Sequence, residues 1–209
     1  MRAEVLVVGA GPSGSTLASK LAEKGLEVVL VDSSMRPGKL SCSGIVGPEG
    51  VRELPKGIPI VSELRWAEIW VGGEPCLRLE GEIGYVLDRP ALDRILLEEA
   101  SCRVRTVLGA RFEALSRRGA LLRVKGRGVE VVEAEYLVGA DGVTSQVRKS
   151  LRIPPPPSYV GVQLEAEKGP SDGFIVNLER GSRFSWLHPS PRGWRAGALG
   201  VPGDPVLLW

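Results

Sequence analysis

The sequence predicts an α/β protein in which a Rossmann-like parallel sheet is interleaved with a second, antiparallel sheet. Three observations predict this class. A β-branched run at residues 4–8 leads directly into a glycine-rich turn and a helix, as at the start of a nucleotide-binding unit. From Glu63 onward, short strand-like runs alternate with glycine turns. Four consecutive prolines at 154–157 then stiffen the chain before a further set of alternating strands.

The first third of the chain has the pattern strand, helix, strand and long loop. Residues 4–8 are almost continuously apolar, as expected of a parallel strand that is buried on both faces. Residues 15–24 are predicted to form a helix that stops at Gly25, and residues 27–31 a second strand that ends at Asp32. Residues 33–62 carry glycine, proline and serine with weak periodicity, which predicts a long functional loop.

The remaining elements are mostly short strands. Residues 64–71, 75–79 and 84–87 are expected to be strands broken by Gly72-Gly73 and Gly81, and a helix over 90–100 begins with proline after a capping Asp88. Strands are also predicted at 103–108, 111–116, 120–125, 129–133 and 136–140, then, after a helix through Ser150, at 159–167, 174–178, 184–187 and 195–201. This order predicts a discontinuous nucleotide-binding domain, 1–62 with 88–157, and a substrate-binding domain, 63–87 with 158–209.

Composition and charge exclude several classes of function. Of the 209 residues, 43% are hydrophobic and 25% are charged, and the net charge of +2 provides no basic stripe for nucleic acid. No apolar run approaches the roughly 20 residues of a membrane span, and the opening segment is too short for a signal peptide. The spacing of Cys42, Cys76 and Cys102 fits neither a metal site nor a disulfide framework. We expect a cytoplasmic protein, and the scarcity of asparagine and glutamine is typical of a thermophile.

The glycine-rich turn has the spacing GxGxxG, in the residues Gly9, Gly11, Pro12, Ser13 and Gly14. Asp32 lies 21 positions after Gly11, at the end of the next strand, which completes the dinucleotide fingerprint. Gly9 permits the tight turn, Gly11 lets a pyrophosphate approach the backbone, and Gly14 lets helix and strand pack closely. Asp32 would accept hydrogen bonds from a ribose hydroxyl and repel a 2′-phosphate. NADP is therefore disfavoured, while FAD and NAD both remain.

Residues farther along the chain favour FAD. A nicotinamide dehydrogenase would continue as alternating strands and helices, whereas here a long loop and antiparallel strands interrupt the sheet. The segment 137–142, which contains Asp141 and Gly142, resembles the second nucleotide motif of the aromatic-hydroxylase-like flavoproteins. The segment 85–89 resembles the same group's helix start, whose arginine contacts the flavin cofactor. Arg89 would occupy that position, and the alternative is a salt bridge to Asp93.

The whole pattern resembles the geranylgeranyl reductase family, the FAD enzymes that saturate isoprenoid double bonds. The similar stretches are 7–17, 42–45, 84–96 and 137–148, and a fifth is Phe184-Ser-Trp186-Leu-His188-Pro189. The fifth is similar to the family's signature Tyr-x-Trp-x-Phe-Pro, with Phe184 in place of tyrosine and His188 in place of phenylalanine. The loop Cys42-Ser43-Gly44-Ile45 differs from the usual Cys-Gly-Glu-Gly, so the resemblance leaves the isoprenoid substrate open.

The resemblance implies roles for individual residues. It places Ser15 and Asp32 on the ADP half of FAD, Arg89 on the cofactor, and a backbone contact at Ala110 beside the adenine. Cys42 and Ser43 would lie in the loop that passes the flavin. The Cys42 thiol would tune or protonate the site, or else be an inert small residue.

The resemblance also places Phe184, Trp186 and His188 in the substrate site. Trp186 would be a wall of a lipid tunnel or a core residue. His188, the single histidine, would be a general base or a packing residue, and the phenylalanine of the family favours packing. The substrate would be an isoprenoid or prenylated lipid, with at most peripheral membrane contact.

One family feature is missing from the sequence. Nothing matches the third nucleotide motif, a Gly-Asp followed by a glycine-rich helix start that receives the flavin ring, and the chain closes on the apolar Val206-Leu-Leu-Trp209. We therefore expect a fold that is incomplete at the C-terminus, with a second polypeptide supplying this motif. The expected function is FAD-dependent reduction of isoprenoid C=C bonds. The alternatives are a flavin hydroxylase and a non-catalytic or split flavoprotein fragment.

Overall fold

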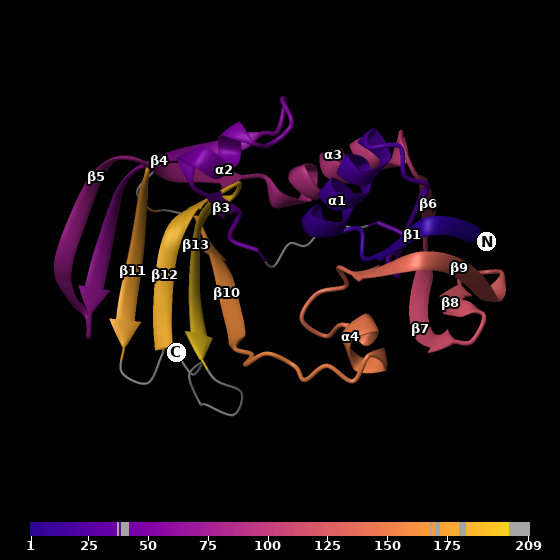
Figure 1. Ribbon diagram of the computed structural model, residues 1–209. Helices are drawn as coiled ribbons and strands as arrows, with labels where there is room; N and C mark the ends of the chain where they lie inside the picture. The colour runs from indigo at the N-terminus through magenta and orange to yellow at the C-terminus, as the bar shows by residue number, and fades with distance from the viewer. Residues whose placement is uncertain (37, 39–41, 168, 170–171, 180–182, 201–209) are drawn as a thin grey trace. The chain divides into compact units, whose positions relative to one another are not determined.

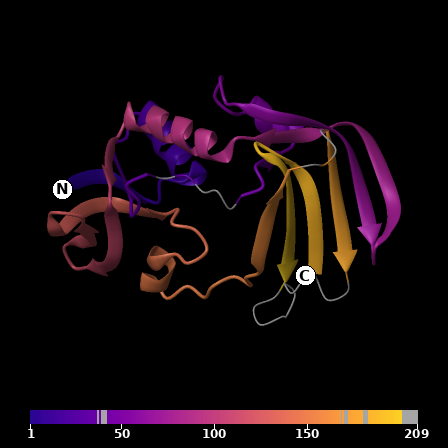
Figure 2. The same cartoon turned by 180° about the vertical axis from the view of Figure 1, so that it is seen from behind.

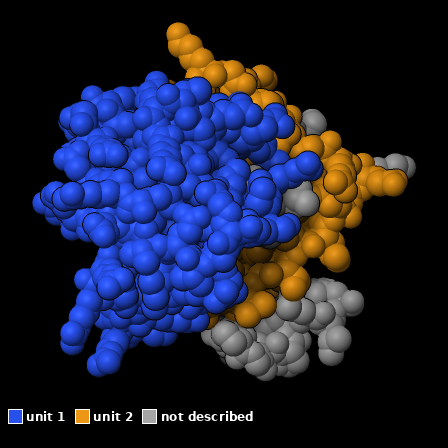
Figure 3. Space-filling model, turned by 90° about the vertical axis from the view of Figure 1, so that its right-hand side faces the viewer, with its two compact units in different colours: residues 1–39, 90–156 blue, residues 40–89, 157–209 orange. Residues whose placement is uncertain are grey.

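The computed structural model describes residues 1–36, 38, 42–167, 169, 172–179 and 183–200 (Figure 1). The chain divides into two compact units, coloured separately in Figure 3. The first unit comprises Met1–Lys39 and Pro90–Pro156, and the second comprises Leu40–Arg89 and Pro157–Trp209. The predicted α/β class is confirmed.

The first unit is built on a six-stranded sheet with the order β6-β2-β1-β9-β8-β7. Its strands are β1 (Arg2–Val8), β2 (Val28–Asp32), β6 (Arg105–Leu108), β7 (Ala110–Ser116), β8 (Gly119–Val124) and β9 (Gly128–Gly139). The pairs β2–β6, β1–β2 and β1–β9 are parallel, whereas β8 pairs antiparallel with both β7 and β9. Strand β9 is one continuous strand that pairs with β1 and with β8. The sequence predicted two separate strands in this segment, at 129–133 and 136–140.

Three helices belong wholly or largely to this unit: α1 (Pro12–Glu23), α3 (Arg89–Ser101) and α4 (Gln146–Ser150). Helix α1 starts three residues before the predicted boundary because proline, which lacks an N–H, is accommodated in a helix's first turn. Helix α4 ends at Ser150, as predicted, and is a single short turn that begins at Gln146. The first unit has two hydrophobic core clusters. Ala18 of α1 and Ala100 of α3 share one of them with β1 and β2, and Val147 of α4 lies in the second cluster.

The second unit is a seven-stranded sheet with the order β10-β13-β12-β11-β4-β5-β3 (Figures 1 and 2). Its strands are β3 (Ile45–Val46), β4 (Ile60–Val71), β5 (Glu74–Leu87), β10 (Val160–Ala166), β11 (Gly173–Glu179), β12 (Arg183–Ser190) and β13 (Gly193–Gly200). The sheet is antiparallel, as predicted, except that β11 pairs parallel with β4.

Two further details differ from the sequence prediction. Strand β5 continues through Gly81, which has a φ of +125° and lies in the bulge that β5 forms between its pairings with Leu64 and Trp66 of β4. Residues 40–62 lie in the second unit because β3 pairs with β5; this segment also contains a short helix, α2 (Pro48–Arg52). The apolar ending 206–209 lies outside the described residues.

Candidate functional site

The fingerprint residues meet at the carboxyl ends of three adjacent parallel strands, β2, β1 and β9. The Gly9 N–H donates to the Val31 carbonyl at 2.7 Å, and the Ala140 N–H donates to the Val8 carbonyl at 2.7 Å. The turns after β1 and β9 therefore lie side by side, with Asp32 at the end of β2. Ligands of open α/β sheets bind at such an edge.

The three fingerprint glycines have different structural roles. Gly9 has a φ of +107°, and an added Cβ there would overlap the Ala140 carbonyl. A Cβ on Gly14 would overlap the Gly9 carbonyl oxygen, so this glycine sets the distance between α1 and the turn. A Cβ on Gly11 would meet nothing within 4 Å. Gly9 and Gly14 are thus needed by the fold, and Gly11 leaves open space for a ligand.

The N-terminus of α1 fits the pyrophosphate of a dinucleotide. Gly11 is the N-cap residue and offers no side chain, and the first turn holds no acidic residue. The first turn of this 12-residue helix therefore adds no carboxylate of its own to the positive helix end. Ser15 is fully buried, and its hydroxyl donates to the Ala10 carbonyl at 3.1 Å. This hydrogen bond stabilises the glycine-rich turn between β1 and α1.

The carboxylate of Asp32 is held in place by two backbone donors. Its Oδ2 accepts from the Ala10 N–H and its Oδ1 accepts from the Ser34 N–H, each at 2.7 Å. A carboxylate can accept about four hydrogen bonds, so both oxygens keep the capacity to accept from a ribose hydroxyl.

Asp141 and Ala110 flank the same edge. Asp141 Oδ2 accepts from the N–H groups of Gln146 and Val147 at 2.6 and 3.2 Å, which caps α4. Its Oδ1 is buried and has no hydrogen-bond partner among the described residues. Ala110 is buried at the start of β7, next to Gly109, whose N–H donates to the Ser34 carbonyl at 3.2 Å.

In the second unit, the cysteine loop is attached to the end of β5. The Gly44 carbonyl accepts from the Leu87 N–H at 3.0 Å. Arg89 Nη1 donates to Cys42 Sγ at 2.8 Å. The sequence assigned Cys42 and Arg89 to the cofactor on separate grounds, and the structure brings their side chains together. Ser43 is half-buried beside them.

Arg195 is a residue that the sequence reasoning missed. Its Nη1 donates to the Cys42 carbonyl at 2.7 Å, and its Nε donates to Glu165 Oε1 at 2.8 Å. Ser190 donates to the other carboxylate oxygen at 2.5 Å. Burial raises the pKa of Glu165, but the bonds from Ser190 and Arg195 outweigh it and leave the pKa lowered. Arg195 and Cys42 are 153 residues apart, so only strand register reveals this contact.

Phe184, Trp186 and His188 alternate along β12 and therefore lie on one face of the second sheet. The rings of Phe184 and Trp186 are 5.5 Å apart between centroids. The indole of Trp186 covers Gly197, where an added Cβ would overlap it. His188 is fully buried, its Nδ1 lies 2.6 Å from the Pro189 carbonyl oxygen, and burial lowers its pKa.

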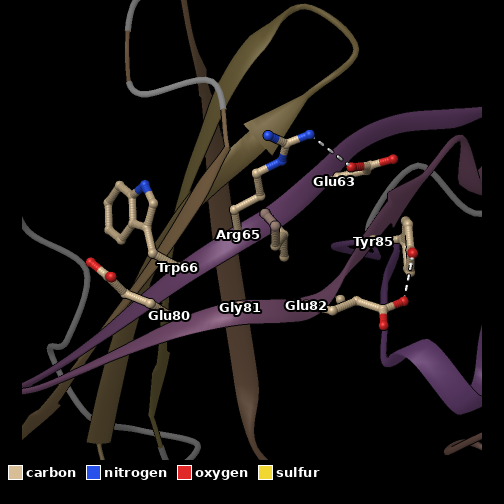
Figure 4. A pocket seen from close by; sticks show the side chains of 9 residues that line it. Glu63, Arg65, Trp66, Glu80, Gly81, Glu82 and Tyr85 are labelled. Atoms are coloured by element: carbon tan, nitrogen blue, oxygen red, sulfur yellow. Dashed lines mark hydrogen bonds and ion pairs between the residues drawn. The ribbon is translucent and has the colours of Figure 1, made fainter.

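A hollow of about 480 Å³ opens elsewhere in the second unit, at the register shift between β4 and β5 (Figure 4). Its walls carry Glu63, Glu80 and Glu82, together with Arg65 and aromatic side chains. Arg65 pairs with Glu63 at 3.3 Å, and the Tyr85 hydroxyl donates to Glu82 at 2.7 Å. None of the site residues predicted from the sequence lines it.

The sequence matches two domain families. Residues 7–62 match the NAD(P)-binding Rossmann-like domain, and residues 76–164 match the FAD binding domain. No helix among the described residues is both long and apolar enough to cross a membrane. Fold, fingerprint and domain matches together define an FAD-dependent flavoprotein of the Rossmann type, and they confirm the prediction of FAD.

Comparison with individual relatives shows which Rossmann-type flavoproteins this chain is similar to. The chain is 33% identical to digeranylgeranylglycerophospholipid reductase of Methanothrix thermoacetophila, with 100% of this chain and 60% of the relative aligned. It is 36% identical to the reductase of the same name from Methanosarcina mazei, with 96% and 55% aligned. The chain is thus similar to these reductases over almost all of its residues, and it spans a little more than half the length of these relatives.

Solved structures show the same fold. A geranylgeranyl bacteriochlorophyll reductase-like protein from Thermoplasma acidophilum superposes with a TM-score of 0.80 at 21% identity, covering 96% of this chain and 56% of that protein. The flavin-dependent monooxygenase PieE, solved with FAD and substrate, gives a TM-score of 0.69 at 18% identity, covering 99% and 44%. The fold is thus shared with monooxygenases.

Proposed function

We propose that this chain carries the ADP-binding edge and the substrate sheet of an FAD-dependent reductase that saturates isoprenoid C=C bonds of lipid precursors. The names of the reductase relatives support this proposal, and one observation in the structure carries it: the sheet face that bears Phe184 and Trp186 has an apolar row across β12, β11, β4 and β5.

The apolar face follows from strand register. Trp186 pairs with Val176, Val176 with Ile69, and Ile69 with Leu77, which gives a row of apolar side chains across four strands. A second row runs from Phe184 through Leu178 to Val71. Leu77 and Val71 remain 49% and 52% exposed. A row of this kind suits a long hydrocarbon chain better than a compact aromatic ring.

The opposite face of the same strands carries charged side chains together with the apolar ones of Trp66, Trp70, Ile175 and Leu187. Arg78 donates to Glu68 at 2.8 Å and to Glu80 at 3.0 Å, and its guanidinium lies 4.7 Å from the ring centroid of Trp66. The length of the apolar row that contains Trp186 favours the reductase over the hydroxylase, which is the second candidate because monooxygenases share the fold.

Each unit has a separate task in this proposal. The α1 N-terminus at Gly11 would hold the pyrophosphate, and Asp32 would accept from the ribose. Arg89 and Cys42 would contact the cofactor, and Arg195 fixes the Cys42 carbonyl. When bound and reduced, FAD supplies the hydride for such a reaction. The apolar rows would orient the chain and exclude water.

Two finer expectations belong to the same proposal. A second polypeptide, or a further part of the same protein, would supply the Gly-Asp motif that the sequence lacks. The protein would act in the cytoplasm, with peripheral contact to the membrane from which a prenylated lipid is drawn.

The test is retention of FAD followed by turnover. The purified chain should keep a visible flavin band through gel filtration after incubation with FAD. With dithionite as reductant and no oxygen, a digeranylgeranyl lipid should gain two hydrogens per double bond by mass spectrometry. If the product gains oxygen in air instead, the hydroxylase is the correct function. Failure to retain FAD, alone or with a separately expressed C-terminal half of a relative, would contradict the proposal.

A further inference from the structure

The seven-stranded sheet of the second unit ends at β10, and this edge strand lacks the usual protections (Figure 1). Its outer edge forms no strand pairing among the described residues. The seven residues of β10 pair with β13 without a bulge, include no proline, and are all exposed except Gln163. Only Glu165 is charged, and Arg195 of the same chain donates to its carboxylate. An edge strand of this kind pairs readily with a strand of another chain.

The other edges of the two sheets are protected. Strand β3 has two residues and β6 has four, so both edges are short. Strand β7 is as long as β10, but it carries the exposed charged residues Arg111 and Glu113, and a bulge lies between Phe112 and Ala114. Short strands, exposed charges and bulges are the features that prevent edge pairing. Among the sheet edges that the structure describes, β10 is therefore the one that stays open to a partner.

The apolar side chains of β10 are gathered on one face. Val160, Val162 and Leu164 alternate along the strand, and Leu164 is 73% exposed, more than any other large hydrophobic residue in the described part of the chain. Val162 and Leu164 pair with Ala198 and Ala196 of β13, whose small side chains leave them uncovered. A strand added beside β10 would bury these side chains against its own.

A second copy of β10 fits this edge in one register. When a two-fold axis relates two identical antiparallel strands, one residue of the strand lies opposite itself. With Gln163 on the axis all seven residues of β10 pair, whereas any other centre leaves residues at the ends unpaired. Val162 then lies opposite the partner's Leu164. The exposed apolar side chains of both copies therefore meet on the same face.

The polar residues of β10 agree with the same register. Glu165 lies opposite the partner's Gly161, so the two carboxylates are kept apart. A register centred on Glu165 would place them directly opposite each other, which is destabilising. Gln163 lies opposite the partner's Gln163, and a carboxamide both donates and accepts, so the two side chains complement each other.

We propose that β10 is a docking edge for a second copy of this chain, and that antiparallel β10 strands centred on Gln163 join the two seven-stranded sheets into one. One strand from each copy makes a small interface, so we expect a weak dimer with a Kd on the order of 100 µM. The proposal concerns β10 alone and does not depend on FAD or on an isoprenoid substrate.

The test is the oligomeric state of the whole chain, measured by sedimentation equilibrium without added FAD. Loading concentrations from about 10 µM to about 1 mM cover the expected Kd by ten-fold on each side. The average mass should rise from that of the monomer toward that of the dimer and go no further, because a two-fold interface closes on itself. A chain that stays monomeric up to the highest concentration overturns the proposal.

A pair of single substitutions assigns the dimer to β10. Leu164→Lys occurs twice in each dimer and replaces the most exposed apolar contact by a charge, so the Kd should rise at least ten-fold. Leu115→Lys on β7 is the matched control, because Leu115 is also an exposed leucine of an edge strand. The control should leave the Kd unchanged. A dimer that persists in Leu164→Lys uses another surface, and the proposal is then overturned.

A charge exchange at the axis tests the register. Gln163→Lys and Gln163→Glu each place two like charges opposite each other, and each should raise the Kd about five-fold. An equimolar mixture of the two variants places lysine opposite glutamate and should recover the affinity of the wild-type chain. Equal affinity of the mixture and of the separate variants would overturn the register centred on Gln163.

Gly161 provides a second measurement of the register if the Gln163 variants fail to fold. A Cβ at Gly161 would make only ordinary contacts, the nearest at 3.7 Å from the Ala198 carbonyl oxygen. Gly161→Lys would lie opposite the partner's Glu165 and should tighten the dimer, whereas Gly161→Glu should weaken it, each about three-fold. Equal affinities of these two variants would contradict the proposed pairing.

Discussion

The two units build their candidate sites from different parts of the chain. In the first unit the site consists mainly of backbone: glycines without side chains, a helix N-terminus and a turn held by the Asp32 carboxylate. In the second unit it consists of side chains on a sheet face, fixed by Arg195, Glu165 and Ser190. The first site therefore depends on short-range sequence, and the second depends on strand pairing.

This difference decides how each site should respond to substitution. A backbone site fails when a side chain is added, because main-chain atoms cannot move aside. A side-chain site fails when a buried partner is removed, because the group left behind is desolvated and unpaired. The two kinds of failure can be tested separately. One substitution adds an atom to the first unit, and the other removes a charge from the second.

The largest effect is expected from Gly14→Ala. The new Cβ would overlap the Gly9 carbonyl oxygen, a main-chain atom next to the packed turns of β1 and β9. Alanine gains about 1 kcal/mol in helix propensity, but overpacking of a rigid contact costs up to about 3 kcal/mol. We expect a net loss of up to about 2 kcal/mol in the free energy of unfolding, measured by urea denaturation, together with loss of FAD retention.

Gly11→Ala is the matched control within the same turn. Its backbone is extended, with a φ of −73°, and its Cβ would meet nothing within 4 Å. The free energy of unfolding should fall by no more than about 1 kcal/mol, the usual difference between N-cap residues. FAD affinity should nonetheless fall at least ten-fold. Unchanged FAD affinity in Gly11→Ala would show that the open space at Gly11 is not a ligand site.

The second effect concerns Arg195. Arg195→Met keeps the length of the side chain but leaves Glu165 and the Cys42 carbonyl without their donor, in a place where the arginine side chain is only 13% exposed. We expect a loss of about 2 kcal/mol in the free energy of unfolding, as for hydrogen bonds to charged groups. The apparent pKa of Glu165 should rise toward its ordinary value.

Arg78→Met provides the comparison on the same sheet. Arg78 also bonds two groups, Glu68 and Glu80, but its side chain is 49% exposed and water replaces the lost contacts. Its loss of stability should be clearly smaller than that of Arg195→Met. If the two variants are equally destabilised, the Arg195 network does not hold the cysteine loop.

The same contrast explains what the sequence could predict. Gly9, Gly11, Gly14 and Asp32 lie within 24 residues and have fixed local geometry, so their meeting at one sheet edge follows from the motif. The partners of Arg195 are distant in sequence and depend on a register that alternation alone does not specify.

The errors in the fold prediction have the same origin. The sequence suggested two breaks, at Gly81 and between 133 and 136. In the structure, pairing with neighbouring strands carries β5 and β9 through these positions. The parallel pairing of β11 with β4 joins segments about 100 residues apart in sequence, and no local pattern signals it.

The smallest effect is a pH dependence that belongs to His188. Burial lowers the pKa of His188 below its ordinary value of 6.5, and the ring faces Arg195 and Glu165 from the neighbouring strands. Below pH 6.5 the unfolded chain therefore binds more protons than the folded chain, so stability decreases as the pH falls. The decrease cannot exceed about 1.4 kcal/mol per pH unit for one group.

His188 is the only histidine in the sequence, so His188→Phe should remove this slope. The free energy of unfolding of the wild-type chain, measured by urea denaturation between about pH 7 and 5, should decline, while that of the variant stays level. Glu165 has a lowered pKa and contributes a separate loss only below its ordinary value of 4.5. A slope that survives in His188→Phe would mean that another group titrates in this range, and that His188 accepts a proton without cost in the folded protein.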